Sequence, residues 1–144
     1  MITSPIVQAL GGLVIFYIGL KMFSGGMKAM GKLEHLEFFI HNPYWMFLGG
    51  IVCTLLWQSS SLSTTAIIGL VASGALPLPS AIAAVLGANI GTTGTIWLAG
   101  VMVSDGMPTG ITRQIAIVHT SVNLFMALTL LPFIQPIARF VSRF

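Results

Sequence analysis

Charged side chains are scarce in this sequence, which has six Lys and Arg and three Asp and Glu among 144 residues. A soluble domain of this length needs far more polar surface. Hydrophobic residues instead make up 56% of the chain, and the mean hydropathy is +0.97. The composition therefore excludes a soluble globular domain and indicates an integral membrane protein.

The sequence has a single cysteine, and we recognise neither a basic patch nor a secretory leader. Cys53 is the only cysteine, so an intrachain disulfide is excluded and the redox compartment stays undetermined. The basic residues lie near the ends of apolar segments rather than in one patch, which argues against nucleic-acid binding and for interfacial anchoring. The first apolar segment is long and has no basic leader, so we expect it to remain as a membrane-spanning helix.

A run of small polar residues, 58–65 (Gln-Ser-Ser-Ser-Leu-Ser-Thr-Thr), lies between two apolar arms. Each arm has about 14 residues and is about 20 Å long as a helix. A hydrocarbon core is roughly 30 Å thick, so neither arm spans it. We therefore predict a re-entrant helical hairpin over residues 43–74 whose tip, residues 58–61, lies at depth, surrounded by protein or by a water-filled cavity.

The rest of the chain completes an all-α membrane fold. We predict crossings over residues 5–24, 79–103 and 112–131, an amphipathic interfacial helix over 28–41 and an interfacial tail over 133–144. The crossing over 79–103 contains Gly87, Gly91 and Gly94 among polar residues, so we predict that this helix is broken. His35 and His41 fall on different faces of the interfacial helix, which favours solvated side chains over metal ligands.

Both predicted interruptions expose helix ends. The N-terminal ends offer unpaired N–H groups and a positive dipole for an anion, and the C-terminal ends near Trp57 and Ala88 offer carbonyls for Na⁺. We predict anion-binding residues Gln58, Ser59, Ser60, Ser61, Asn89, Gly91, Thr92 and Thr93, and Na⁺ ligands Gln58, Ser61, Thr64 and Asn89. No Lys or Arg lies mid-span, so bound cations would have to help neutralise the anion. Under the alternative interpretation, the hydroxyls only join helices.

His119 and Asn123 are four residues apart, on one face of the last crossing. That face is a candidate lining for a cavity or a proton path. A hydrogen bond from His119 to a neighbouring helix is the other interpretation. No acid within a span is available to orient His119, and no nucleophile motif is recognisable, so we do not expect an enzyme.

Three segments of the chain resemble the type II sodium-phosphate cotransporter family. They are residues 58–65, residues 86–93 (Leu-Gly-Ala-Asn-Ile-Gly-Thr-Thr), and Arg113 with His119 and Asn123. One departure is Val122, which stands where a Phe commonly precedes the Asn. The resemblance implies Na⁺-coupled symport of inorganic phosphate in the cell membrane, plasma or inner, with the hairpin at the binding sites and no cofactor besides Na⁺. The alternative is a phosphate-binding subunit or sensor that does not transport.

Members of that family carry this unit twice, as inverted repeats that form one path, whereas residues 1–144 contain it once. Three crossings and a hairpin place the two termini on opposite sides, so a second copy would be inverted. We therefore expect an antiparallel homodimer, with an opposite-orientation partner chain or a fragment of a longer transporter as alternatives. The distribution of basic residues opposes the homodimer because it favours one orientation: Lys28, Lys32, Arg139 and Arg143 share a side, against Arg113.

Overall fold

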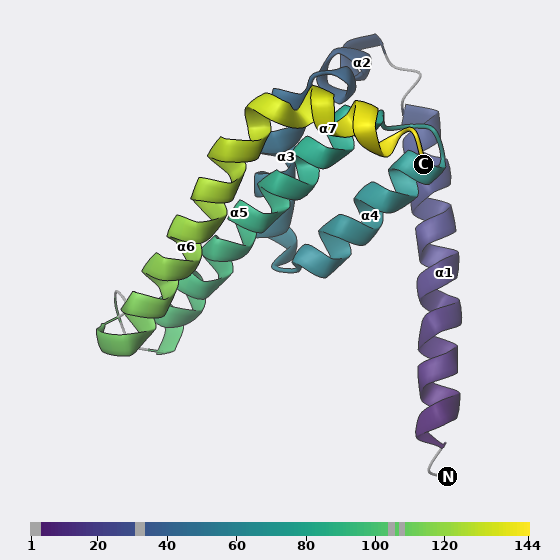
Figure 1. Ribbon diagram of the computed structural model, residues 1–144. Helices are drawn as coiled ribbons and strands as arrows, with labels where there is room; N and C mark the ends of the chain where they lie inside the picture. The colour runs from purple at the N-terminus through teal and green to yellow at the C-terminus, as the bar shows by residue number, and fades with distance from the viewer. Residues whose placement is uncertain (1–3, 31–33, 104–105, 107–108) are drawn as a thin grey trace.

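The computed structural model describes residues 4–30, 34–103, 106 and 109–144. Within these residues all regular structure is helical (Figure 1). The elements are α1 (Pro5–Met30), α2 (Glu34–His41), α3 (Pro43–Trp57), α4 (Ser60–Ala72), α5 (Leu78–Val103), α6 (Gly110–Leu130), the 3₁₀ turn η1 (Leu131–Phe133) and α7 (Ile134–Val141).

Three segments are long and apolar enough to cross a membrane: Pro5–Phe23, Leu78–Met102 and Gly110–Val141. They belong to α1, α5 and α6, and the last continues through η1 into α7. The helices α3 and α4 are apolar but shorter than a span. An all-α membrane protein with three crossings is therefore confirmed in its coarse form.

The predicted hairpin consists of α3 and α4, which form a V in Figure 1. Asn42 caps α3, because its Oδ1 accepts a hydrogen bond from the Tyr44 N–H at 3.0 Å, and Pro43 occupies the first turn. Only Gln58 and Ser59 separate α3 from α4. The turn is thus shorter than the predicted tip, since Ser60 and Ser61 already belong to α4. Its depth in a membrane stays a prediction.

The prediction of a broken helix over residues 79–103 is wrong, since α5 is one continuous helix. Its glycines serve close packing against α3 instead. A Cβ at Gly87 would collide with the carbonyl of Phe47, and one at Gly91 would lie 2.7 Å from the Thr54 Cβ. Gly50 of α3 approaches the Ala84 carbonyl of α5 in the same way. The cost of glycine in a helix is about 1 kcal/mol per residue, and the close α3–α5 contact offsets it.

The helix that contains the first crossing is longer than predicted, although its apolar span, Pro5–Phe23, agrees with the predicted crossing. Helix α1 does not end at Gly25 and Gly26 but runs on to Met30. Neither glycine has a positive φ, so neither supplies the left-handed residue that ends many helices. The predicted interfacial helix over residues 28–41 is correspondingly reduced to α2, with residues 31–33 outside the described part. Phe39 of α2 stacks edge-on against Trp45 of α3, with ring centroids 5.2 Å apart, and joins the two helices.

The C-terminal helices agree closely with those predicted from the sequence. The crossing predicted over residues 112–131 is α6, and Pro132 lies in η1, where the chain bends into α7. Helix α7 lies over the N-terminal part of α5 (Figure 1) and buries Ile134 and Ala138. Ile134 packs in a small core with Ala83 and Leu86 of α5. The predicted tail is therefore a short helix with one buried face.

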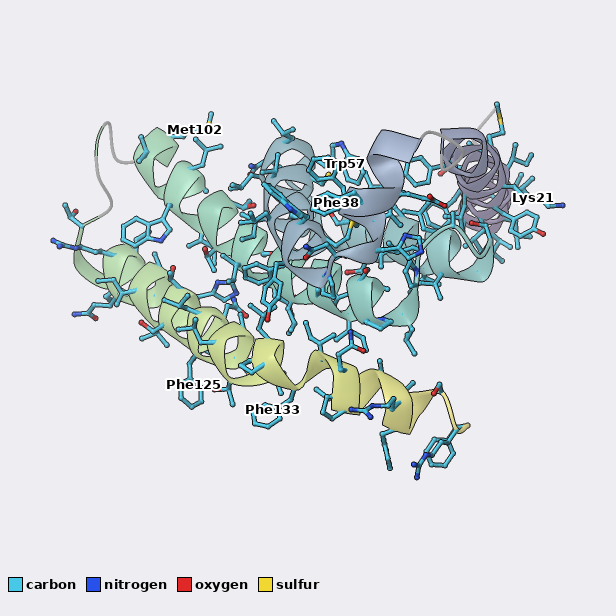
Figure 2. All side chains as sticks on the ribbon, turned by 90° about the horizontal axis from the view of Figure 1, so that it is seen from above. Lys21, Phe38, Trp57, Met102, Phe125 and Phe133 are labelled. Carbon is cyan, nitrogen blue, oxygen red and sulfur yellow. The ribbon has the colours of Figure 1, made fainter. Side chains whose placement is uncertain are left out.

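Large apolar side chains cover the outside of α1 and α6. Figure 2 shows Phe125 and Phe133 pointing away from the other helices, and they are 71% and 57% exposed. In α1 every side chain described is exposed except Leu20, which is half-buried. Outward apolar faces of this extent are typical of helices solvated by lipid.

Candidate functional site

The α3–α4 turn consists of one left-handed residue followed by one extended residue. Gln58 is left-handed, with φ +52°, and it is the only non-glycine residue with positive φ in the described part of the chain. Its N–H donates to the Thr54 carbonyl at 2.8 Å. Ser59 is extended and caps α4, because its Oγ accepts a hydrogen bond from the Leu62 N–H at 3.2 Å. The turn thus ends one helix and starts the next within two residues.

An open polar pocket of about 300 Å³ lies beside this turn and is lined by Ser60, Ser61, Thr64, Thr65 and Asn89. The first four belong to α4, and Asn89 comes from α5. The structure therefore brings together four predicted ligands that are up to 29 residues apart in sequence, Ser60 and Asn89 being the most distant pair.

Thr65 is a lining residue that was missing from the predicted ligands. It lies one helical turn after Ser61, and its Oγ1 donates to the Ser61 carbonyl at 2.7 Å. The spacing of four residues places both side chains on one face of α4, so helical periodicity was the signal that could have identified Thr65.

Gln58 and Ser59 do not line the pocket, although they form the adjacent turn. The Gln58 side-chain amide donates to the Leu55 carbonyl. This hydrogen bond uses Nε2, and the Oε1 of the same amide is a separate atom that accepts hydrogen bonds or binds a cation. The Ser59 hydroxyl is engaged in capping. Both residues belong to the turn that leads into α4 and not to the pocket lining.

Gly91, Thr92 and Thr93 do not form a helix N-terminus. The Thr92 hydroxyl donates to the Ala88 carbonyl at 2.9 Å, and the Thr93 hydroxyl donates to the Ile90 carbonyl at 2.7 Å. Gly91 is buried in the α3–α5 contact. The helix end on which the predicted anion site at these residues was based is therefore missing, and the carbonyl of Ala88 lies inside a continuous helix. Anion binding by these residues stays a prediction.

Two buried hydroxyls behind the turn were not predicted as functional. Thr54 of α3 donates from Oγ1 to the Oγ of Ser63 of α4 at 2.8 Å, and the Ser63 hydroxyl donates to the Ser59 carbonyl at 3.0 Å. Their relative exposures are 0% and 2%. This chain of hydrogen bonds links the end of α3 to the start of α4.

The predicted cavity-lining pair, His119 and Asn123, lies on α6 and does not line the polar pocket. The Asn123 Nδ2 is 3.3 Å from the His119 ring nitrogens, so the two side chains contact each other within one helix. The bond between helices comes instead from Thr120, whose hydroxyl accepts a hydrogen bond from the Trp97 indole N–H at 3.0 Å. A role of His119 and Asn123 in lining a cavity stays a prediction.

The chemistry of the polar pocket is that of neutral oxygen donors. Four hydroxyls and one amide line it, and no Lys, Arg, Asp or Glu is among these residues. Hydroxyl and amide oxygens suit hard cations, while hydroxyl and amide N–H groups donate to oxyanions. The first-turn N–H groups of Ser60 and Ser61 have no partner within a helix and add donors to the same place.

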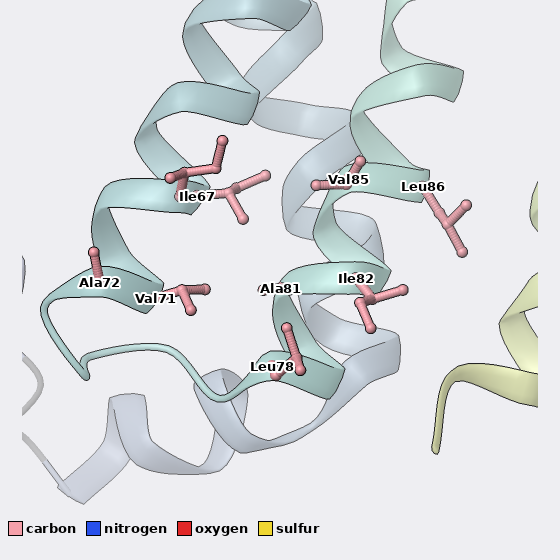
Figure 3. A pocket seen from close by; sticks show the side chains of 9 residues that line it. Ile67, Val71, Ala72, Leu78, Ala81, Ile82, Val85 and Leu86 are labelled. Atoms are coloured by element: carbon pink, nitrogen blue, oxygen red, sulfur yellow. The ribbon is translucent and has the colours of Figure 1, made fainter. Parts of the chain in front are cut away.

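An apolar groove separates the other ends of α4 and α5 (Figure 3). It has a volume of about 440 Å³. In the close-up, Ile67 and Val71 of α4 point toward Ala81 and Val85 of α5, whereas Ile82 and Leu86 line the groove on the side away from α4. Beside this groove the two helices pack together through a buried cluster that includes Ile67, Leu70 and Ala81.

Comparisons with known proteins identify close relatives of this sequence. Residues 15–135 match the Na⁺/Pi-cotransporter family. The chain is 36% identical over 130 residues to the sodium-dependent phosphate transport protein 2A of Rattus norvegicus, an alignment that covers 85% of this chain and 20% of the rat protein. It is 32% identical over 133 residues to protein 2B of Homo sapiens, which covers 88% of this chain and 19% of the human protein.

A bacterial relative is the uncharacterized protein YqeW of Bacillus subtilis (strain 168), 37% identical over 87 residues, or 58% of this chain and 28% of that protein. No solved structure matches the chain. The chain spans about one fifth of the length of the mammalian proteins. The mammalian proteins are transporters by name. The family match covers most of the sequence, and the chain belongs to the Na⁺/Pi-cotransporter family.

Proposed function

We propose that this chain forms one half of a Na⁺-coupled symporter of inorganic phosphate in the cell membrane. The observation that carries the proposal is the pocket at the α3–α4 turn, where four hydroxyls and Asn89 converge. The relatives named for sodium-dependent phosphate transport supply the two solutes. The chain itself supplies polar donors and acceptors on an otherwise apolar scaffold.

Phosphate would be held at the start of α4. The N–H groups of Ser60 and Ser61 point out of the first helical turn, where the helix dipole favours negative charge. Their hydroxyls add further donors. Because no basic side chain lines the pocket, these dipoles alone leave the phosphate charge largely uncompensated. Binding therefore requires cations in the same place, which is the physical basis of coupling.

Sodium would be held by oxygens of the same pocket. The predicted ligands Ser61, Thr64 and Asn89 all line it. Gln58 lies next to them at the turn and would contribute Oε1 while its Nε2 donates to the Leu55 carbonyl. Each Na⁺ that binds there offsets one phosphate charge, so removing sodium is expected to weaken phosphate binding.

The open pocket needs a second wall. Its lining comes from α4 and α5 alone, and Ser61 and Asn89 are exposed. Exposed polar groups at membrane depth are costly unless protein or water covers them. Three crossings and one hairpin place the chain ends on opposite sides, so a second copy in antiparallel orientation would present the same residues from the other side. We propose this homodimer, with an opposite-orientation partner chain as the alternative.

Thiol labelling tests the orientation. In a Cys53→Ala background, Ser4→Cys and Ser142→Cys each place a single cysteine near one end of the chain, at exposed positions. In an antiparallel homodimer an impermeant thiol reagent labels each position from both sides of native membranes. Labelling of every copy from one side only would rule out this arrangement.

Uptake of labelled phosphate by proteoliposomes tests the function. Gln58→Ala and Ser60→Ala should abolish Na⁺-dependent uptake while the protein stays folded. Ser73→Ala is the matched control, because the Ser73 hydroxyl donates to the Leu70 carbonyl at the far end of α4. Normal uptake by both pocket variants would refute the proposal. Phosphate binding without counterflow exchange would indicate a sensor subunit instead.

A further inference from the structure

Behind the polar pocket, Thr54 and Ser63 lie where three helices meet. Thr54 receives the Gln58 N–H on its carbonyl at 2.8 Å and donates from its hydroxyl to Ser63 at 2.8 Å. The Ser63 hydroxyl in turn donates a hydrogen bond to the Ser59 carbonyl at 3.0 Å. Both residues of the turn, Gln58 and Ser59, are therefore bonded to this pair.

Helix α5 supports Thr54 from the opposite side. A Cβ at Gly91 would lie 2.7 Å from the Thr54 Cβ and 3.2 Å from its Cγ2. The missing side chain of Gly91 is thus what allows Thr54 to sit against α5. Packing restricts the methyl group, and the hydroxyl on the same carbon is then directed at Ser63.

Neither residue is able to act as a ligand, because both are buried and neither lines the pocket. What they fix is the direction in which α4 leaves the turn. The left-handed conformation of Gln58 is costly for a residue with a Cβ, so it needs support from its surroundings. The Gln58 N–H bond to the Thr54 carbonyl supports it through the backbone, and the side-chain bonds from Thr54 through Ser63 to the Ser59 carbonyl hold the residue that follows.

We infer that Thr54 and Ser63 are positioning residues for the phosphate site, joined by the Thr54–Ser63 hydrogen bond that holds the Gln58-Ser59 turn and with it the first turn of α4. The inference rests on the proposed function for the identity of the bound ion. Its structural part concerns the turn alone and is testable without transport.

Two substitutions at position 54 separate the hydrogen bond from the packing. Thr54→Val keeps the methyl group against Gly91 but removes the donor, whereas Thr54→Ser keeps the donor and removes the methyl. We expect Thr54→Val to raise the KM for phosphate about fivefold to tenfold, the loss typical of one hydrogen bond, with kcat changed less. Thr54→Ser should lower the unfolding midpoint yet keep the KM of the unmodified chain.

Ser63→Ala removes the same bond from the other partner and serves if Thr54→Val fails to fold. The double variant Thr54→Val with Ser63→Ala should raise KM no further than the larger of the two single effects, since both remove one interaction. Thr129→Val, at an exposed position on α6, is the matched control and should leave KM unchanged.

A labelling experiment keeps this inference distinct from the proposed function. In a Cys53→Ala and Ser61→Cys background, the rate of thiol modification reports the geometry of the first turn of α4. Thr54→Val or Ser63→Ala should change this rate severalfold, and Thr54→Ser should not. If the unmodified chain shows no uptake, the symport proposal fails while labelling still decides the role of the pair. An unchanged labelling rate, or an unchanged KM with only a lower unfolding midpoint, would overturn the inference.

Discussion

Two segments of this chain look alike in sequence and fold differently. Residues 58–65 and residues 87–95 are both rich in small polar residues and interrupt apolar stretches. The first contains a turn at Gln58 and Ser59. The second lies within α5, which continues through it as a regular helix. Small and polar composition alone therefore does not determine whether a membrane helix breaks.

The difference lies in what the small residues contact. In α5, Gly87 and Gly91 face α3 and are needed for close approach of the two backbones. The threonines of the segment bond carbonyls of their own helix. At the turn, the Ser59 hydroxyl instead caps a new helix. A break forms where side chains satisfy the freed backbone groups, and a continuous helix forms where a neighbour covers the glycines.

The strongest test of this contrast is Gly87→Ala. Its new Cβ would collide with the Phe47 carbonyl, a backbone atom, so α3 and α5 would have to separate. We expect the free energy of unfolding to fall by about 3 kcal/mol, the upper part of the usual range for overpacking. Denaturant titration in mild detergent measures it. Gly12→Ala on α1, with nothing within 4 Å of the new Cβ, is the control; an equal loss there would contradict the packing role.

Removing the helix cap at the turn is expected to have the next largest effect on stability. Ser59→Ala removes the acceptor for the Leu62 N–H and should lower the free energy of unfolding by about 1 kcal/mol. The same titration measures the loss. Ser59→Asp restores an acceptor and should recover most of the stability, whereas equal stability of the Ala variant would show that the cap is not needed.

Gln58→Gly separates the shape of the turn from its chemistry. Glycine adopts positive φ without strain but is more disordered in the unfolded chain, so the unfolding free energy should stay within about 1 kcal/mol of the unmodified chain. Uptake of phosphate should nevertheless be lost, because the side-chain amide is gone. Retained Na⁺-dependent uptake would mean that Gln58 acts only through its backbone.

The smallest effect is expected at Thr92→Val. The Thr92 hydroxyl donates to a carbonyl of its own helix, so its removal should change the unfolding free energy by no more than about 0.5 kcal/mol. A loss as large as that of Ser59→Ala would show that hydroxyls in the helix and in the turn are equivalent, against the contrast drawn above.

Much of the fold could be predicted from the sequence, because the hydropathy and the length of a segment depend only on the residues of that segment. The three crossings, the two short arms and the Asn42 cap all follow from residues within one segment. The break at Gln58 and Ser59 was also predicted, because the apolar arms on either side of the polar run are each too short to span a membrane. Of the predicted ligands, Ser60, Ser61, Thr64 and Asn89 meet in one pocket.

The errors arose where the outcome depends on a neighbouring helix. Glycine content suggested a break in α5, yet Gly87 and Gly91 are four residues apart and share one face, the spacing typical of close helix packing in membranes. The glycine spacing was present in the sequence, but it does not show which helix the glycines contact. Thr54 and Ser63 likewise become visible only when α3 and α4 are brought together. Local pattern predicts elements, and contact between elements decides their details.

The apolar groove between α4 and α5 has a mechanical consequence. The widest helix contact in the described chain joins α3 to α5, while α1 packs mainly on α4. The groove of Figure 3 leaves a gap in the contact of α4 with α5, but beside it the two helices share a buried cluster that includes Ile67, Leu70 and Ala81. A displacement of α4 would therefore break part of this cluster and would carry α1 with it.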